Sequence, residues 1–518
     1  MSNIELRLDV YSHNIKISQI SPRAKNIVID FCLTLGEREL IKKQRFDSTR
    51  GRWVIVYEKV LKRIYAAATN DRSEFRIHIN CYNDFIKHLA WNGLHEEHIE
   101  IVIHPLYDPI NIDLNFIDKR VPREEDQVPA INYLVDEGKT KVLTLQTGRG
   151  KTACANHAIN KIKEKVVIIL KGMYVQRWID DLNDCFKFKP GELMVVRGSK
   201  DMMRLIELAQ EKLLDAKIII ITNTTFRMFI DDYEAHKEKN MYGCNPEDFF
   251  KIIGAGVRLI DEAHQDFHLN FKIDLYTNIK KCISLSATLM SDNQFLNKMY
   301  ELMFPILTRA PDFGYNKYIV VKALLYHLQD PHKIRYKQRG RTSYSHVVFE
   351  ESIMKQEKIF KRYKEMIMEI IQNDFVEGWK PGQKMLIFCA TVELCTKLTQ
   401  YLKNMFSEFD VVRYIAEDDY SVIDKANIIV STLKSAGTAV DIPGLKKTLM
   451  TVAVGSRQAN EQAVGRLRQL KQWPDEQPEF LYLVCLDIPS HLEYHRHKKS
   501  VLSDKILSLK EYNTPYKI

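Results

Sequence analysis

The chain has 518 residues, of which 45% are hydrophobic, 28% charged and 10% aromatic. This is globular usage, and it excludes disordered, collagen-like and membrane-embedded classes. Lysine and arginine exceed aspartate and glutamate by 76 − 67 = 9, a modest excess that favours a polyanionic partner without identifying one. The longest aliphatic runs, 166–170 and 218–221, are far shorter than the roughly 20 residues that cross a bilayer, so no membrane partner is expected.

The nine cysteines include no CxxC pair and no metal-type spacing. The start of the chain also lacks the charge and hydrophobicity order of a signal peptide. Both features indicate buried thiols in a reducing cytoplasm. We therefore expect a cytoplasmic protein, monomeric or weakly oligomeric, without a disulfide-linked partner.

The first 118 residues predict a small α+β domain. Ile4, Leu6, Leu8 and Val10 alternate with polar residues and share one face of a strand. The run 53–57 predicts a second strand, and 82–91 has the pattern of a helix.

Short β-branched runs alternate with amphipathic stretches from about residue 140 onward. This order predicts βα units around a parallel sheet, because strands buried on both faces lose their polar alternation. The runs are 141–145, 166–170, 193–196, 217–222, 257–260 and 282–286, and then, after a lapse between about 306 and 350, 384–390, 411–416, 427–432, 448–454 and 479–486. We expect an N-terminal domain at 1–118, α/β domains at 119–306 and 353–518, the latter with a helical tail, and a linker or hairpin at 307–352.

The strongest local motif is LQTGRGKT at 145–152, between a predicted strand and a predicted helix. Such a loop can wrap its N–H groups around phosphate oxygens at a helix N-terminus, where the helix dipole also favours an anion. Gly148 and Gly150 permit the tight path, Lys151 can neutralise phosphate charge, and the Thr152 hydroxyl can ligate Mg²⁺. As a bare pattern the loop could be a chance turn, but its flanking elements favour phosphate binding.

A second motif, DEAH at 261–264, follows the predicted strand 257–260. Asp261 could complete the Mg²⁺ shell, and Glu262 could orient and deprotonate an attacking water. Alone, such a tetrapeptide is usually a solvated helix start; with the upstream loop it favours nucleotide hydrolysis. His264 and His268 are spaced like a metal pair, yet no third ligand is evident.

The segment 332–348 alternates basic and aromatic residues about a glycine. It predicts a hairpin whose cations meet phosphates while its rings stack on bases, and a plain solvated hairpin is the alternative. The candidate nucleic-acid-binding residues here are Lys333, Arg335, Tyr336, Lys337, Arg339 and Arg341. The basic cluster 491–500 is more simply a solvated helix.

Taken in order, these motifs resemble those of superfamily 2 helicases. The residues 171–182 resemble motif Ia with the QW element Gln176 and Trp178, 218–226 the Ib/Ic region, and 284–289 motif III. The residues 384–398, 428–445 and 461–469 are similar to motifs IV, V and VI. The resemblance implies two tandem RecA-like parallel-sheet domains behind the small α+β domain, with ATP and Mg²⁺ as cofactors.

The resemblance also assigns roles by position. It makes catalytic the residues Lys151, Asp261, Glu262, Arg466 and Arg468, with the arginines reaching the γ-phosphate from the second domain. It places around the nucleotide Gln127, Thr147, Gly148, Gly150, Lys151, Thr152, Asp261, Gly437, Asp441 and Gln462, with Gln127 on the adenine and with Thr152 and Asp261 on Mg²⁺.

Two further groups follow from the same resemblance. Coupling between the nucleotide and nucleic-acid sites would fall to His264, Ser286 and Thr288, with Gly437 and Asp441. Contact with the nucleic-acid backbone would fall to Lys171, Thr222 and Thr432. Plain strand-end hydroxyls are the alternative for both threonines.

Within this superfamily the chain is most similar to phage recombination and branch-migration helicases of the UvsW type and to XPB-like proteins. The segments 45–65 and 339–351 carry this likeness. It implies a phage-encoded enzyme of the bacterial host cytoplasm acting on duplex, forked or branched DNA, with Arg45, Arg50 and Arg52 gripping duplex. An RNA helicase, or an ATP-switched nucleic-acid-binding protein without unwinding activity, remains an alternative.

Overall fold

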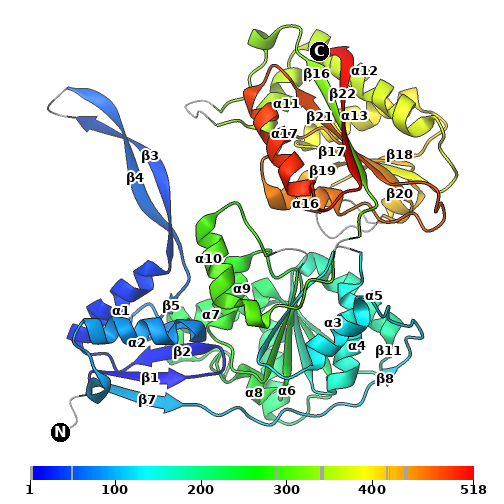
Figure 1. Cartoon of the computed structure of the whole chain (residues 1–518). Helices are drawn as coiled ribbons and strands as arrows, with labels where there is room; N and C mark the ends of the chain where they lie inside the picture. Colours follow the sequence, from blue (N-terminus) through cyan, green and yellow to red (C-terminus); the bar gives the residue numbers. More distant parts are fainter. Residues whose placement is uncertain are drawn as a thin grey trace. The chain divides into compact units, whose positions relative to one another are not determined.

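The computed structural model describes residues 4–518 except 48, 50, 147, 287, 288, 315, 339–342, 416, 417, 419, 420 and 437–441. The chain divides into two compact units (Figure 1). The first contains Met1–Leu145 and Arg149–Phe313, and the second contains Gln146–Gly148 and Gly314–Ile518.

The first unit begins with a five-stranded sheet in the order β5-β6-β2-β1-β7. Its strands are β1 (Leu6–Val10), β2 (Asn14–Ser18), β5 (Ala67–Ala68), β6 (Phe75–His78) and β7 (Ile99–Ile103). The helices α1 (Pro22–Thr34) and α2 (Tyr82–Trp91) accompany it, and α2 has the predicted bounds. A proline in the first turn and the Ser21 side chain, which accepts the Ala24 N–H, set the start of α1.

A long hairpin extends from this sheet (blue in Figure 1). Its strands β3 (Gly36–Asp47) and β4 (Arg52–Ile64) form a separate two-stranded antiparallel sheet. The predicted strand 53–57 lies within β4.

Six parallel strands form the second sheet of the first unit, in the order β12-β13-β10-β14-β15-β9. They are β9 (Thr140–Thr144), β10 (Val166–Leu170), β12 (Leu193–Val196), β13 (Ile218–Thr222), β14 (Val257–Ile260) and β15 (Lys281–Ser286). The helices of this part are α3 (Gln127–Val135), α4 (Lys151–Ile162), α5 (Val175–Cys185), α6 (Gly198–Gln210), α7 (Asn223–His236), α8 (Phe249–Ile252), α9 (Phe267–Asp274) and α10 (Gln294–Met303). A small pair, β8 (Asn115–Phe116) and β11 (Phe186–Lys187), lies apart from this sheet.

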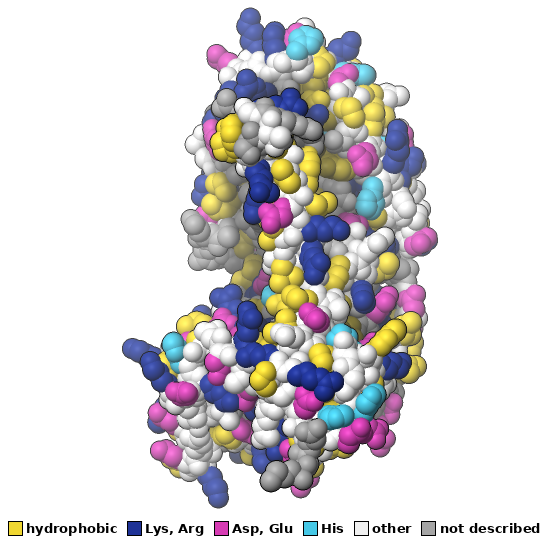
Figure 2. All heavy atoms as spheres, turned by 90° about the vertical axis from the view of Figure 1, so that its left-hand side faces the viewer, with side chains coloured by type: hydrophobic (Ala, Val, Ile, Leu, Met, Phe, Trp, Pro, Cys, Tyr) yellow, Lys and Arg dark blue, Asp and Glu magenta, His cyan; other side chains and the backbone are white. Residues whose placement is uncertain are grey.

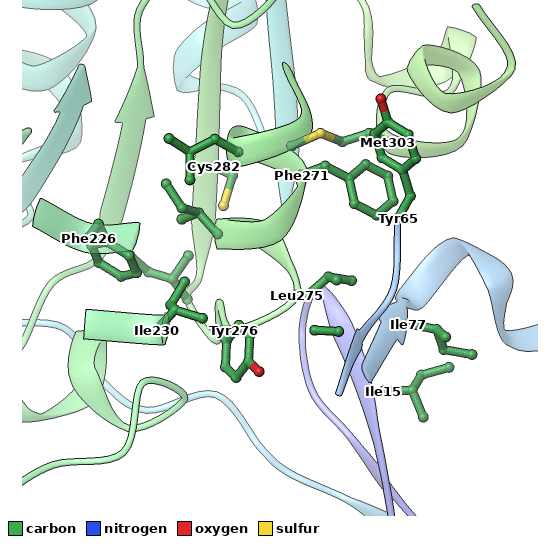
Figure 3. Packing of buried hydrophobic residues seen from close by; sticks show 14 of the residues in the cluster. Ile15, Tyr65, Ile77, Phe226, Ile230, Phe271, Leu275, Tyr276, Cys282 and Met303 are labelled. Atoms are coloured by element: carbon green, nitrogen blue, oxygen red, sulfur yellow. The ribbon is translucent and has the colours of Figure 1, made fainter. Parts of the chain in front are cut away.

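The N-terminal sheet and this parallel sheet share one continuous core (Figure 3). Ile15 and Ile77 come from the N-terminal sheet, and Phe271 and Leu275 from the parallel-sheet part. Buried polar groups also cross the boundary. His78 Nε2 lies 2.8 Å from Asp274 Oδ2, and the same carboxylate pairs with Arg258. The N-terminal domain is therefore packed into the first unit rather than tethered to it.

The second unit is built on seven parallel strands in the order β18-β19-β17-β20-β21-β16-β22. They are β16 (Val320–His327), β17 (Lys384–Cys389), β18 (Val411–Tyr414), β19 (Ile428–Thr432), β20 (Leu445–Met450), β21 (Glu479–Cys485) and β22 (Ser508–Lys517). Its helices are α11 (His346–Met354), α12 (Glu357–Ile371), α13 (Val392–Met405), α14 (Val422–Lys425), α15 (Leu433–Ala436), α16 (Arg457–Val464) and α17 (Pro489–Leu502). Hydrophobic clusters cover both faces, as expected for a parallel sheet.

The two parallel sheets confirm the predicted α/β class, with tandem RecA-like domains behind a small α+β domain. The expected lapse of strands between about 306 and 350 was wrong over Val320–His327, which forms β16. The charge of Lys322 hid this strand in the sequence. Its ammonium group is paired with Asp374 at 2.9 Å and Glu479 at 2.8 Å.

All nine cysteines are free and buried, which confirms the prediction of buried thiols. Among the described residues, no helix is both long and apolar enough to span a membrane.

Candidate functional site

The loop 145–152 connects β9 to α4, as the motif predicted. Gly148 and Gly150 have φ angles of +86° and +85°, a region that favours glycine. A Cβ atom on Gly150 would lie 2.5 Å from Gln127 Nε2, so a side chain there would displace the Gln127 amide as well as strain the backbone. Gly150 ends the loop and α4 begins at Lys151, which leaves the first N–H groups of the helix directed at the loop.

Lys151, at the start of α4, faces the DEAH sequence at 261–264, which we call the acidic motif. Its ammonium nitrogen lies 3.4 Å from Glu262 Oε1, and the lysine is 9% exposed. The two motifs are 111 residues apart in sequence, and the parallel sheet brings them to the same edge.

Asp261 follows β14 and is held by two donors. The Trp178 indole N–H donates to Oδ2 at 2.8 Å, and the Glu262 backbone N–H donates to Oδ1 at 2.9 Å. Burial, and then the neighbouring Glu262 carboxylate, raise the pKa of Asp261. A carboxylate in such a position gains from a nearby cation, which makes it a suitable ligand for Mg²⁺.

Glu262 has a φ angle of +48°, in the left-handed region where a glutamate is strained. The conformation turns its carboxylate between two partners. Glu262 Oε1 faces Lys151, and Oε2 lies 3.4 Å from His264 Nδ1. Backbone strain of this kind is characteristic of functional positions.

His264 connects the acidic motif to the end of β15. Its Nδ1 atom lies 2.8 Å from the Ser286 hydroxyl oxygen, and both residues are buried. The structure thus places the expected coupling residues His264 and Ser286 in contact.

The loop 145–152, which we call the phosphate loop, is also hydrogen-bonded to residues at and just before the start of α3. Arg149 donates to Asp126 Oδ2 at 2.7 Å, and Arg123 donates to the same carboxylate and to the Arg149 carbonyl oxygen, each at 2.8 Å. The Gln127 amide donates to that carbonyl oxygen at 3.0 Å and accepts the Arg123 backbone N–H at 3.0 Å. An adenine contact by Gln127 would have to replace these bonds.

Lys171 and Thr222 lie at the ends of β10 and β13, on the same edge of the sheet. Lys171 forms an ion pair with Asp266 at 3.1 Å. Thr222 is buried and caps α7, accepting the Thr225 N–H at 3.3 Å. The hydroxyl of Thr222 therefore already has a structural use.

In the second unit, Thr432 caps the helix that follows β19. Its hydroxyl oxygen accepts the Ser435 N–H at 3.1 Å. Gln462 lies in α16, and Arg466 and Arg468 follow that helix. Arg466 is 6% exposed, and its Nε donates to the Gln462 carbonyl oxygen at 3.4 Å.

The basic segment 332–348 also lies in the second unit, where an antiparallel bridge joins Lys337 and Tyr344. Lys333 and Arg335 are exposed, and Lys333 pairs with Asp330 at 3.1 Å. Tyr336 packs partly against the core, with the Lys337 ammonium nitrogen 5.8 Å from its ring centre. The Tyr344 hydroxyl is hydrogen-bonded to His346 and His491, which holds this ring in the domain.

Several expected site residues lie outside the described part of the chain. They are Arg50, Thr147, Thr288, Arg339, Arg341, Gly437 and Asp441.

Sequence reasoning missed the roles of Trp178, Asp126 and Arg149. The QW element singled out Trp178, but only the fold shows its N–H on Asp261. Asp126 is buried. The sequence does not reveal this, because the residue belongs to the charged run 123–126, which looks solvent-exposed. An arginine inside the loop, Arg149, was the one feature of the sequence from which an acidic partner could have been predicted.

One family model matches this part of the chain. It is described as "Type III restriction enzyme, res subunit", and it matches residues 119–291. This segment contains the phosphate loop, the acidic motif and Ser286. The match supports a superfamily 2 helicase-type domain.

Solved structures were also compared. Mss116p, in a structure bound to ssRNA and AMP-PNP, is 17% identical with a TM-score of 0.47, over 75% of this chain and 74% of that chain. A fragment described as an HsdR subunit of a type I restriction enzyme from Vibrio vulnificus YJ016 is 14% identical with a TM-score of 0.49, over 96% of this chain and 87% of that chain. No curated protein matches the chain.

Proposed function

We propose that the protein is an ATP-dependent superfamily 2 DNA helicase or translocase, which couples ATP hydrolysis to movement on duplex, forked or branched DNA. The observation that carries the proposal is the convergence of the phosphate loop and the acidic motif at one sheet edge, with Lys151 and Glu262 3.4 Å apart. The family match over residues 119–291 supports the same conclusion.

The residues at this edge fit Mg²⁺ and ATP. The loop around Gly148 and Gly150 has the positive φ angles of a phosphate cradle, and Thr152 and Asp261 supply oxygen ligands of the kind that Mg²⁺ prefers. When bound, the metal would neutralise phosphate charge. Lys151 would bind phosphate oxygens, and Glu262 would orient and deprotonate the attacking water.

Arg466 is proposed to stabilise the negative charge that develops on the transferred phosphoryl group, with Arg468 as the second candidate. Gln462 on the preceding helix is proposed to join the nucleotide contacts. An arginine in this role is typically worth about 10³ to 10⁵ in rate. Arg466→Ala should therefore lower hydrolysis on the order of 10³-fold, and an unchanged rate would remove this arginine from the mechanism.

A polyanionic partner is proposed because the net charge is +9 and the second unit presents exposed Lys333 and Arg335. DNA is proposed over RNA because the matched family is named for restriction enzymes. Basic and acidic side chains are interspersed over the face drawn in Figure 2, so recognition depends on local sites and not on a uniform field. A UvsW-like or XPB-like subtype with branch migration as its task, encoded by a phage, is part of the proposal.

The test is steady-state ATP hydrolysis by the full chain with duplex DNA, forked DNA and single-stranded RNA compared side by side. The wild type should be stimulated most by DNA, and Lys151→Ala and Glu262→Gln should each abolish the stimulated rate. Lys161→Ala is the matched control, because Lys161 lies exposed on the same helix α4. Retained turnover in both active-site variants would overturn the proposal.

The outcome also separates the alternatives. Stimulation by RNA alone would favour an RNA helicase. ATP binding without stimulation by any nucleic acid would favour an ATP-switched binding protein. Strand separation and branch migration on defined forks then test movement itself.

A further inference from the structure

The hairpin of β3 and β4 is unusual because its strands pair only with each other. The register joins Phe46 to Trp53 and Leu40 to Lys59. Residues that pair across an antiparallel ladder share a face, and alternate residues along each strand return to that face. The register therefore separates the hairpin into two faces.

One face gathers most of the exposed large hydrophobic side chains of the hairpin. We call it the aromatic face, and its described side chains are Arg38, Leu40, Gln44, Phe46, Trp53, Ile55, Tyr57, Lys59 and Leu61. Trp53 is 67% exposed, Tyr57 65% and Leu40 60%. Phe46 and Trp53 meet edge to face, with ring centres 5.5 Å apart. Its described side chains include two exposed cations and no carboxylate.

The opposite face has a different character. It carries Glu39 and Glu58, and each acid has a lysine partner on the neighbouring strand. Lys43 lies 2.6 Å from Glu58, and Lys62 lies 3.3 Å from Glu39. Glu39 and Glu58 are therefore both paired. On the aromatic face, the described side chains offer Arg38 and Lys59 no carboxylate.

Solvent exposure of such a face has a free-energy cost that a ligand would remove. A continuous apolar patch on a soluble protein marks an interaction site, and a lone two-stranded sheet is only marginally stable in water. Aromatic rings beside exposed cations suit a ligand with flat apolar faces and negative charge. Unpaired nucleotides have both, and stacking on aromatic side chains with cations along the backbone is how proteins bind single strands.

The base of the hairpin is fixed to the parallel-sheet part of the same unit. Glu37 accepts a hydrogen bond from Asn293 at 2.6 Å, and Asn293 caps α10. Tyr65, directly after β4, packs its ring against Phe271 and Phe295, with ring centres 5.1 and 5.8 Å away. A strand held on the hairpin is thus held on the unit that carries Lys151 and Glu262.

We propose that the aromatic face binds the unpaired strand of a DNA substrate by stacking its bases on Trp53, Tyr57 and Phe46. Arg38 and Lys59 contact the phosphates of the same strand. The inference rests on the proposed function for its choice of DNA, and it assigns this face a part that the duplex-gripping expectation for Arg45 and Arg52 did not include.

The test measures binding of fluorescein-labelled oligothymidylate, blunt duplex DNA and oligouridylate to the full chain without nucleotide. The double variant Trp53→Ala with Tyr57→Ala should lose at least about 30-fold in affinity for oligothymidylate, since each stacked base contributes about a factor of 5 or more. Its affinity for blunt duplex should change less than about threefold. Trp53→Phe with Tyr57→Phe keeps two rings on the same face and should restore most of the loss.

The matched control is Ile41→Ala with Val56→Ala, two exposed side chains of the opposite face. It should bind all three probes as the wild type does. Arg38→Ala with Lys59→Ala should reduce the salt dependence of single-strand binding by a slope of about 1.4, because two phosphate contacts are removed.

Several results would overturn the inference. These are an unchanged affinity of the double alanine variant for oligothymidylate, an equal loss for duplex, an equal loss in the control, or binding of oligouridylate alone. A change of oligomeric state in the double variant with unchanged DNA affinity would instead show a face for a second copy or another protein. Failure of the proposed function is distinguishable, because it appears as absent ATP hydrolysis in the wild type, whereas failure here leaves duplex-stimulated hydrolysis intact.

Discussion

The two parallel sheets have the same architecture, but the loops at the carboxyl ends of their strands differ. Both are wholly parallel, and in both the strands carry buried hydrophobic residues. At the carboxyl edge of the first sheet lie Lys151 and two carboxylates, beside glycines with positive φ. In the second unit, the loop after β17 is closed by buried Glu350, which accepts the Ala390 and Thr391 N–H groups at 2.7 and 2.8 Å. The architecture is shared, so the chemistry is decided by the loops.

Each unit has several buried lysines, and one from each, Lys151 and Lys498, extends the comparison. Lys151 is 9% exposed and faces Glu262. Lys498 in α17 is 2% exposed, with its ammonium nitrogen 4.1 Å from the ring centre of Tyr482. Burial lowers the pKa of Lys498 to about 7. The first lysine is the proposed phosphate ligand, whereas the second lies among the rings of Phe480 and Tyr482.

The largest expected effect comes from replacing each lysine by methionine. Lys151→Met should lower ATP hydrolysis on the order of 10³-fold or more, because a charge beside the transferred phosphoryl group is lost. Lys498→Met should leave the rate within about twofold. A steady-state assay of both variants measures this, and equal losses would erase the distinction between the two sheets.

The next effect concerns the packing of the N-terminal sheet against the first parallel sheet. Asp274 stabilises this packing through His78 and Arg258. Asp274→Asn leaves Arg258 buried without its partner charge and should cost about 3 kcal/mol in the free energy of unfolding. The Arg258 charge and the hydrogen bond from His78 lower the pKa of Asp274 against the opposing effect of burial. The stability it provides is therefore present above the ordinary aspartate pKa and is lost as the pH falls toward its folded value.

Denaturant unfolding as a function of pH measures this prediction. The wild type should lose stability on the acid side more steeply than Asp274→Asn. Glu211→Gln, an exposed charge change at the end of α6, should behave as the wild type. Parallel acid limbs in the wild type and Asp274→Asn would contradict the expected role of this carboxylate.

A smaller effect, of opposite sign, is expected for the stability of Lys498→Met. The folded lysine has a pKa of about 7, below the ordinary lysine value of 10.5, so between these values the unfolded chain binds more protons. Stability of the wild type should rise with pH across that window. Methionine should remove this slope and stabilise the second unit by about 2 kcal/mol at pH 6. Thermal unfolding at pH 6 and pH 9 measures both, and a lower melting temperature in the variant would contradict the prediction.

The smallest effect is expected at Trp178. Trp178→Phe removes the N–H donor to Asp261, a loss of about 1 kcal/mol, and should raise the pKa of Asp261 further. The acid limb of the pH–rate profile should move to higher pH. Trp379→Phe in the second unit, which loses a hydrogen bond to the Gln383 carbonyl oxygen, serves as the control and should leave the profile in place.

The sequence was most informative where local rules act. Hydrophobic runs predicted the strands of both parallel sheets except β16 and β22. The lysine of β16 depends on partners far away in the chain, and β22 forms where a helical tail was expected. The bounds of α2 were predicted correctly because its hydrophobic periodicity is regular. Lys151 and Glu262 could be found from motif spacing. Their separation of 3.4 Å, and the indole N–H on Asp261, arise from sheet order and could not.

The hairpin shows the same limit. Its strand character was visible at 53–57, but the sorting of aromatic and acidic residues onto opposite faces depends on the register between β3 and β4. A shift by one residue would exchange the two faces.

The backbone conformation of Glu262 bears on whether evolution would retain this residue in the proposed active site. Its backbone conformation, with φ at +48°, suits glycine or asparagine better than glutamate. The backbone conformation therefore does not favour this residue, and mutation toward glycine would relax the chain while removing the proposed acid–base group. A lineage that no longer needed hydrolysis should drift at this codon early, so the residue found there in a homologue reports whether the motor is still under selection.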